Sequence, residues 1–146
     1  MSKLHHFIAL ENLDPRLTEK IPSNEEVLYT SKCTVMKKGY AQGKTFGQIA
    51  ITNKAIAFVC KKSGISAGWA SMKGNVDYIP YKDIVEFKNK KKMFYVKFSI
   101  PEDPTGKKKR GYNVWVERCK EENEDKKDFA ARKVQFANFV EELINK

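Results

Sequence analysis

The sequence predicts a mainly β protein that ends in a helix. Apolar and polar residues alternate in about seven short segments between residues 27 and 117, and the last stretch of the chain changes to helical spacing. The chain has 146 residues, 41% hydrophobic and 12% aromatic, which suits one globular domain. We therefore expect a small antiparallel barrel or sandwich of about seven strands, capped on an open side by an amphipathic C-terminal helix.

The first 24 residues predict a short helical arm ahead of the β domain. Asp14 followed by Pro15 is the pair favoured at a helix N-cap and first helical position, so a helical turn is expected to begin there. We divide the chain into this arm, residues 1–24, and a β domain with its helix, residues 25–146. Earlier in the arm, four apolar residues follow helical spacing: Leu4, Phe7, Ile8 and Leu10.

Seven segments show the two-residue period of strands. In the first, Val27, Tyr29 and Val35 alternate with polar neighbours. The sequence Thr-Asn-Lys at 52–54 has the composition of a tight turn, and Pro80 suits only an edge strand because it lacks an N–H. The predicted strands are residues 27–35, 46–51, 55–60, 78–81, 84–87, 93–100 and 112–117.

The C-terminal segment predicts an amphipathic helix. Asp125 is a suitable N-cap, and Asp128 places a second acid where the helix dipole favours negative charge. The predicted buried face is formed by Phe129, Phe136, Val140 and Leu143, with Ala130, Ala137 and Ile144 beside them.

Positive charge is concentrated in the middle of the chain. The net charge is +10, from 28 Lys and Arg against 18 Asp and Glu. Residues 37–120 alone hold 19 basic and 6 acidic residues, a net charge of +13, whereas both ends are slightly acidic. This distribution indicates an anionic partner such as lipid headgroups, nucleic acid or an acidic protein surface.

Three segments resemble the pleckstrin-homology-like superfamily, and within it the GRAM and GLUE (GRAM-like ubiquitin-binding) domains. They are Glu-Glu-Val-Leu-Tyr at 25–29, Gly-Gln-Ile-Ala-Ile-Thr-Asn-Lys-Ala-Ile-Ala-Phe at 47–58, and Ile-Pro-Tyr-Lys-Asp-Ile-Val at 79–85. The resemblance covers residues 25–145, and it departs at Ala55 and Ile56, where many relatives have a basic residue.

The resemblance implies a non-enzymatic binding module without a cofactor, the membrane-targeting part of an adaptor in trafficking or sorting. Its ligand would be phosphoinositides or other acidic lipids at a membrane surface. The alternative that it implies is a protein-interaction domain that binds ubiquitin. Nucleic-acid binding ranks third, because the sequence shows neither a recognition helix nor an ordered aromatic-basic pattern. We expect a cytoplasmic, peripheral membrane protein that is a monomer and has no small-molecule substrate.

Three basic groups in predicted loops are the candidate lipid-binding residues. Phe46 stands where tight phosphoinositide binders have an arginine, so strong selectivity for one headgroup is not expected. Trp69, in a loop of small residues, could enter the membrane interface or fold back over the barrel. The alternative for the basic groups is that they are solvated loops that keep strand edges soluble. The groups are Lys37, Lys38 and Lys44; Lys88, Lys90, Lys91 and Lys92; and Lys107, Lys108, Lys109 and Arg110.

Other functional patterns are weak. No apolar run approaches the ~20 residues that a membrane span needs, and the N-terminus has no signal-peptide pattern. The segment 39–45 resembles a P-loop but has three residues between its glycines where the motif has four, and a strand follows it. The adjacent pair His5 and His6 would diverge on a helix, so no metal site is predicted. The cysteines are expected to be buried thiols: Cys33, Cys60 and Cys119.

Overall fold

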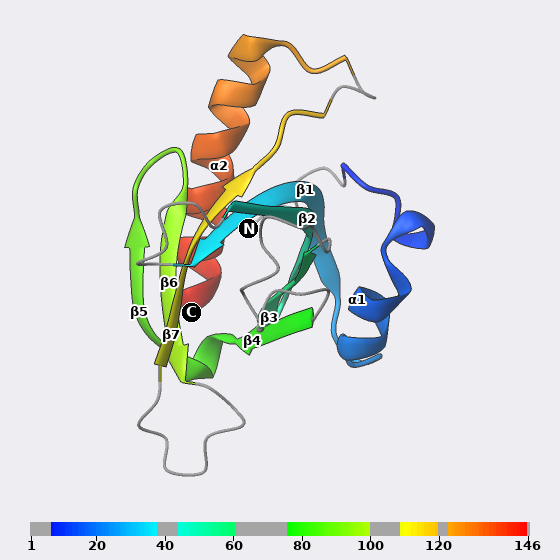
Figure 1. Cartoon of the computed structure of the whole chain (residues 1–146), viewed down its shortest axis with the longest axis vertical. Coiled ribbons are helices and arrows are strands. Elements are labelled where there is room, and N and C mark those ends of the chain that lie inside the picture. The colour runs from blue at the N-terminus through cyan, green and yellow to red at the C-terminus, as the bar shows by residue number, and fades with distance from the viewer. Residues whose placement is uncertain (1–6, 38–43, 61–75, 100–108, 120–122, 146) are drawn as a thin grey trace.

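The computed structural model describes residues 7–37, 44–60, 76–99, 109–119 and 123–145, with the side chains of 37, 44–46, 60, 76 and 77 outside that description. Seven strands precede one long helix in these ranges (Figure 1). The strands are β1 (Val27–Lys37), β2 (Lys44–Thr52), β3 (Ala55–Cys60), β4 (Val76–Pro80), β5 (Ile84–Asn89), β6 (Phe94–Ser99) and β7 (Lys109–Val116). The helical elements are η1 (Leu10–Asn12), α1 (Pro15–Lys20), η3 (Tyr81–Asp83) and α2 (Lys126–Ile144).

The strands form one antiparallel sheet in the order β4-β3-β2-β1-β7-β6-β5, which confirms the predicted mainly β architecture. β1 is the central strand and pairs with both β2 and β7. The turn expected at 52–54 joins β2 to β3, and there the Thr52 hydroxyl accepts hydrogen bonds from the amides of Lys54 and Ala55 (3.0 and 2.9 Å). In the described ranges the sheet is open, with β4 and β5 at its edges, and α2 runs alongside β5 and β7 (Figure 1).

The main core lies between one face of the sheet and α2. Phe136 and Val140 of the helix are fully buried, and the Phe136 ring lies 5.3 Å from Phe94 and 5.5 Å from Tyr29 between centroids. The predicted N-cap is confirmed, because the Asp125 carboxylate accepts a hydrogen bond from the Asp128 amide (2.7 Å). The helix thus covers the inner face of the sheet with Phe136, Val140 and Leu143, as its spacing indicated. Phe139 is also buried, which was not predicted, and Ala130 is exposed.

The helical prediction is wrong for residues 7–9. The Thr30 hydroxyl donates to the Ile8 carbonyl (2.6 Å) and accepts from the Ile8 amide (3.1 Å), and the Phe7 amide donates to the Thr30 carbonyl (2.9 Å). These bonds to β1 satisfy the backbone groups that a helix would have paired. The Asp14 cap is confirmed: its carboxylate accepts from the Arg16 amide (2.9 Å), and α1 begins at Pro15. Leu4 lies outside the described residues.

The N-terminal segment packs on the other face of the sheet. Leu17 of α1 is fully buried, together with Ile8 and Leu13, against β2 and β3. Ala50 and Ala57 are paired across those two strands, and their small side chains leave room for the apolar residues above them. The arm is therefore held by a second, smaller apolar cluster.

Replacing Leu17 with alanine should lower the free energy of unfolding by about 3 kcal/mol, because it leaves a cavity under α1. Urea unfolding followed by circular dichroism measures this change. Leu10→Ala is the matched control: Leu10 is 47% exposed, so its loss should cost less than about 0.5 kcal/mol. Equal, small effects of both substitutions would show that the arm does not dock as described.

A buried arginine joins α2 to the sheet. Arg132 is 4% exposed, and each of its five N–H groups has an acceptor, so its charge is fully hydrogen-bonded. The Phe7 ring also covers the guanidinium, with its centroid 4.0 Å from Cζ. Nε donates to one carboxylate oxygen of Glu124 (2.7 Å), and Nη2 donates to the other (2.8 Å). Nη2 also donates to the Glu117 carbonyl (2.6 Å). Nη1 donates to the hydroxyls of Tyr29 (2.5 Å) and Ser31 (3.0 Å) of β1.

Glu124 is the buried partner of this arginine. Its carboxylate accepts the two bonds from Arg132 and one from the Cys119 amide (2.8 Å). The hydrogen bond from Arg132 is the main reason that the pKa of Glu124 lies below its ordinary value, and the Cys119 amide adds to it. Because the two side chains are each 5% exposed, the pair is a fully desolvated one. This pair was not predicted, because in the sequence Arg132 and Glu124 look like ordinary polar positions.

The depressed pKa of Glu124 predicts a stability that depends on pH. A carboxyl group with a lower pKa in the folded state stabilises the protein above its unfolded pKa, and this contribution is lost as pH falls through the folded pKa. The free energy of unfolding should therefore fall below about pH 5. Glu124→Gln should lower the free energy of unfolding at pH 7 by about 3 kcal/mol. It should also make the further loss of stability at acid pH smaller than in the unmodified protein.

Urea unfolding at a series of pH values measures both effects. Glu86→Gln is the control, because Glu86 pairs with Lys88 on the surface and its loss should cost less than about 0.5 kcal/mol. If Glu124→Gln lost as much stability at acid pH as the unmodified protein, Glu124 would not be the group responsible for that loss.

Candidate functional site

The outer face of β5, β6 and β7, turned away from the core, carries several lysines. Phe94, Val96 and Phe98 of β6 point inward and are buried, so Tyr95, Lys97 and Ser99 point outward. The register brings outward residues of the neighbouring strands beside them. Lys88 of β5 lies opposite Tyr95, Gly111 of β7 opposite Lys97, and Lys109 of β7 opposite Ser99.

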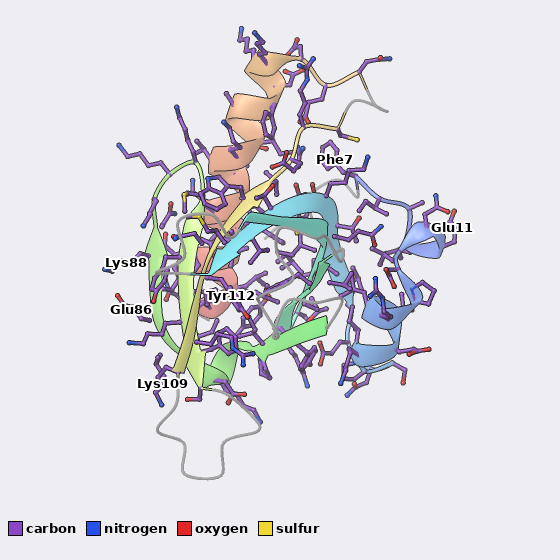
Figure 2. The ribbon with its side chains drawn as sticks, in the orientation of Figure 1. Phe7, Glu11, Glu86, Lys88, Lys109 and Tyr112 are labelled. Carbon is purple, nitrogen blue, oxygen red and sulfur yellow. The ribbon has the colours of Figure 1, made fainter. Side chains whose placement is uncertain are left out.

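Four lysines form a band across this face, and we call Lys88, Lys90, Lys97 and Lys109 the basic face. Successive outward positions on a strand lie about 7 Å apart, and neighbouring strands about 4.8 Å, so the band runs diagonally over three strands. Figure 2 shows Lys88 on β5 and Lys109 at the far end of β7. Glu86 is the one acid in the described strands β5–β7, and its carboxylate lies 3.2 Å from Lys88 Nζ. The band therefore keeps a net positive charge.

Tyr95 lies at the centre of this face and is buried, at 4% exposed. An ideal Cβ on Gly111 would lie 2.9 Å from ring carbons of Tyr95, so the ring occupies the space that a side chain on β7 would need. Lys90 extends over the same ring, with Nζ 5.9 Å from its centroid and 3.5 Å from Asn113 Oδ1. Glycine at position 111 thus lets an aromatic ring lie against the sheet between the lysines.

The β5–β6 hairpin carries three exposed lysines on a strained turn. Lys91 has φ of 72°, and the Lys92 amide donates to the Lys90 carbonyl (2.9 Å), which is a γ-turn pattern rare for residues other than glycine. Asn89 supports it, because its Oδ1 accepts from the Lys91 amide (2.8 Å). The Asn89 amide in turn donates to Asn138 (2.8 Å) and Glu141 (3.2 Å) of α2. We call Lys90, Lys91 and Lys92 the hairpin tip.

The structure places several predicted lipid-binding residues in strands where loops were expected. Lys88 lies in β5, Lys109 and Arg110 begin β7, Lys37 ends β1 and Lys44 begins β2. These strands extend further than the apolar alternation alone indicated, because hydrogen-bonded pairs such as Lys109–Ser99 and Lys44–Met36 continue the ladders past the last apolar residue. Lys38, Lys107, Lys108 and Trp69 lie outside the described residues, as do the side chains of Lys37 and Lys44.

The predicted basic groups do not meet at one point. The hairpin tip lies just before the first residue of β6, whereas Lys109 of β7 lies opposite Ser99, the last residue of β6. These two groups are therefore at opposite ends of β6. Lys37 lies opposite Tyr112, near the start of β7, so its backbone is at the Lys109 end. Arg110 lies opposite Phe98, in the inward row of β7. Lys97 connects the two ends, and sequence reasoning missed it because it belongs to a strand and to no basic run.

The described residues show neither a metal site nor a membrane-spanning helix. In the described residues no three His, Cys, Asp or Glu side chains gather as metal ligands. The helices in the same part of the chain are too short or too polar to cross a membrane. Cys33 and Cys119 are buried, as predicted, and the Cys60 side chain is not described. The fold and the site define a mainly β protein, with one antiparallel sheet, one covering helix and a basic outer face.

Comparisons with known proteins do not assign the chain to a family. No family model matches it, and no curated protein matches it. One solved structure that matches is described as the "Crystal structure of the C-terminal domain of an unknown protein from Leishmania infantum". The likeness covers 68% of this chain and 78% of that chain, with 14% identity and a TM-score of 0.40. A likeness this low identifies neither a fold family nor a function.

Replacing Lys91 with glycine should raise the free energy of unfolding by about 0.5–1 kcal/mol, because glycine adopts positive φ without the Cβ penalty. Urea unfolding measures the change. Lys92→Gly removes the same charge one residue later, where φ is not positive, and should lower stability by about 0.5 kcal/mol. Destabilisation by both substitutions would mean that the turn stores no strain.

Proposed function

We propose that this protein is a non-enzymatic module that binds acidic phospholipid membranes through the basic face and the hairpin tip. The observation that supports this most directly is the diagonal band of lysines on the outer face of β5–β7, with Glu86 as the one acid in those three strands as described. An array of charges spread over three strands fits an extended anionic surface better than it fits a single small ligand.

We also propose that the fold is of the pleckstrin-homology-like kind, with GRAM and GLUE domains as the nearest types. The support is the resemblance of residues 25–29, 47–58 and 79–85 together with the element order, seven antiparallel strands followed by one covering helix. The proposed membrane surface includes lysines in strands as well as the lysines that the sequence places in loops. It therefore extends to Lys97 of β6.

The expected strength of binding follows from the number of lysines. Each lysine near an anionic membrane contributes about 1 kcal/mol, so the band and tip together give an attachment that is substantial at low salt. The attraction should weaken with added salt, because the lysines are exposed and the Debye length falls to about 8 Å at physiological ionic strength. This is the behaviour of a peripheral, reversible membrane protein.

The triple variant Lys88→Glu, Lys90→Glu and Lys97→Glu should weaken binding to phosphatidylserine vesicles more than about 100-fold, since each reversal removes one attraction and adds one repulsion. Vesicle co-sedimentation at low and physiological salt measures it. The matched control is Lys20→Glu, Lys126→Glu and Lys127→Glu, which changes the net charge equally with exposed lysines of α1 and α2.

The control variant should keep most of the binding. Equal losses in both variants would show that net charge alone attracts the protein and would overturn the assignment to this face. Salt-sensitive binding to DNA with no binding to acidic vesicles would replace the lipid proposal by a nucleic-acid one. No binding to either would favour a protein partner, with ubiquitin the first to test.

A further inference from the structure

A concave site, separate from the basic face, lies beside the C-terminal end of α2. It is a cavity of about 670 Å³ between the β2–β3 turn, the end of β4, η3 and the last turn of α2. This volume is within the range of small-molecule pockets, about 300–1,000 Å³. No residue of the basic face or the hairpin tip lines it, so it is separate from the proposed membrane surface.

Part of the lining of this cavity is apolar. It comes from Leu143 and Ile144 of α2, from Pro80 and from the rings of Tyr78 and Tyr81. Leu143 is 7% exposed and belongs to the main core, so its position is fixed by the packing of the helix. An apolar body of a ligand would be removed from water against these residues.

The polar groups at the base are already paired within the protein. Glu25 accepts a hydrogen bond from the Thr52 hydroxyl (2.7 Å) at Oε1 and one from the Tyr78 hydroxyl at Oε2. The Tyr81 hydroxyl donates to the Thr52 carbonyl (2.6 Å). The pKa of Tyr78 and the pKa of Tyr81 are both raised, mainly by burial and secondly by the nearby Glu25 carboxylate. Both hydroxyls therefore stay neutral at physiological pH. The rings are thus held in place, and Glu25 has a donor on each oxygen.

The mouth of the cavity carries two lysines. Lys54 on the β2–β3 turn and Lys82 on η3 are exposed and line it, together with Asn53. Neither lysine forms an ion pair with another side chain in the part of the chain that the structure describes. With the carboxylate of Glu25 engaged at the base, the free charges at the mouth are positive.

We infer that this cavity binds a small amphiphilic anion, with an apolar chain against Leu143, Ile144 and Tyr81 and an acidic group between Lys54 and Lys82. The acidic group can be a carboxylate or a phosphate, because the two lysines act as point charges with no fixed fork geometry. Charge complementarity at the mouth and apolar walls below it together select this class over a neutral or cationic amphiphile. The inference is independent of the proposed membrane binding.

Titration of the ¹⁵N-labelled full chain by NMR tests this proposal with four probes of one chain length. They are octanoate, octyl phosphate, octanol and octylammonium. We expect both anions to shift the amides of Lys54, Lys82 and Ile144, with octanol about fivefold weaker or more and octylammonium weaker still. Comparing octanoate with octyl phosphate shows which acidic group the lysines prefer.

Two variants make the result specific. Lys54→Gln with Lys82→Gln should weaken octanoate binding about tenfold and leave octanol unchanged, because only the charges are removed. Lys20→Gln with Lys126→Gln is the control of equal charge, and should leave octanoate binding unchanged. Because these lysines are exposed, the variants are expected to fold, and their vesicle binding should be near that of the unmodified protein.

Several results would overturn the inference. Equal affinity for octanoate and octanol would show that the lysines play no part, and tighter binding of octylammonium would show that Glu25 dominates the site. Shifts confined to residues away from this cavity, or no shifts with any probe, would show that it is not a binding site. Each of these results leaves the vesicle experiment on the basic face unaffected.

Discussion

Arg132, which forms a buried ion pair with Glu124, is the residue on which the placement of α2 depends. Removing two charges from water costs several kcal/mol, and here the cost is offset because every guanidinium N–H and both carboxylate oxygens have partners. A displacement of about 1 Å would break several of these bonds together. Apolar packing alone would let the helix slide or rotate, whereas the bonds from Arg132 to the Tyr29 and Ser31 hydroxyls and to the Glu117 carbonyl hold α2 in one position against β1 and the end of β7. We infer that this network contributes more to that position than to net stability.

The hairpin tip and the cavity both depend on the helix that Arg132 holds against the sheet. Asn138 and Glu141 hold Asn89, and Asn89 holds the strained turn of the hairpin tip. Within the next turn of the same helix, Leu143 and Ile144 form one wall of the cavity. The hairpin tip and the cavity therefore have no residues in common but are supported by the same two turns of α2.

Most of the fold was predictable from local pattern, and most of the site was not. The strands, the 52–54 turn and the Asp14 and Asp125 caps follow from residues near each other in the chain. The helical prediction failed at residues 7–9, because Thr30, 22 residues away, takes their hydrogen bonds. Arg132 was missed because the hydroxyls that bury it are on β1, about a hundred residues earlier. The basic face depends on which strands are neighbours, and that order is a property of the whole sheet.

The spacing of the lysines determines what kind of recognition the basic face supports. Outward positions on a strand are about 7 Å apart and cannot be drawn together without breaking the ladder. Lys88, Lys97 and Lys109 are therefore spread along a diagonal of the sheet, and each ammonium lacks the planar fork with which arginine binds a phosphate. A face of this kind responds to the density of negative charge on a surface. The cavity has the opposite design, with walls that close on one apolar body and two charges at its mouth. In the proposed protein, attraction to a membrane comes from the face, and selectivity for a particular molecule can come only from the cavity or from residues beyond the described strands.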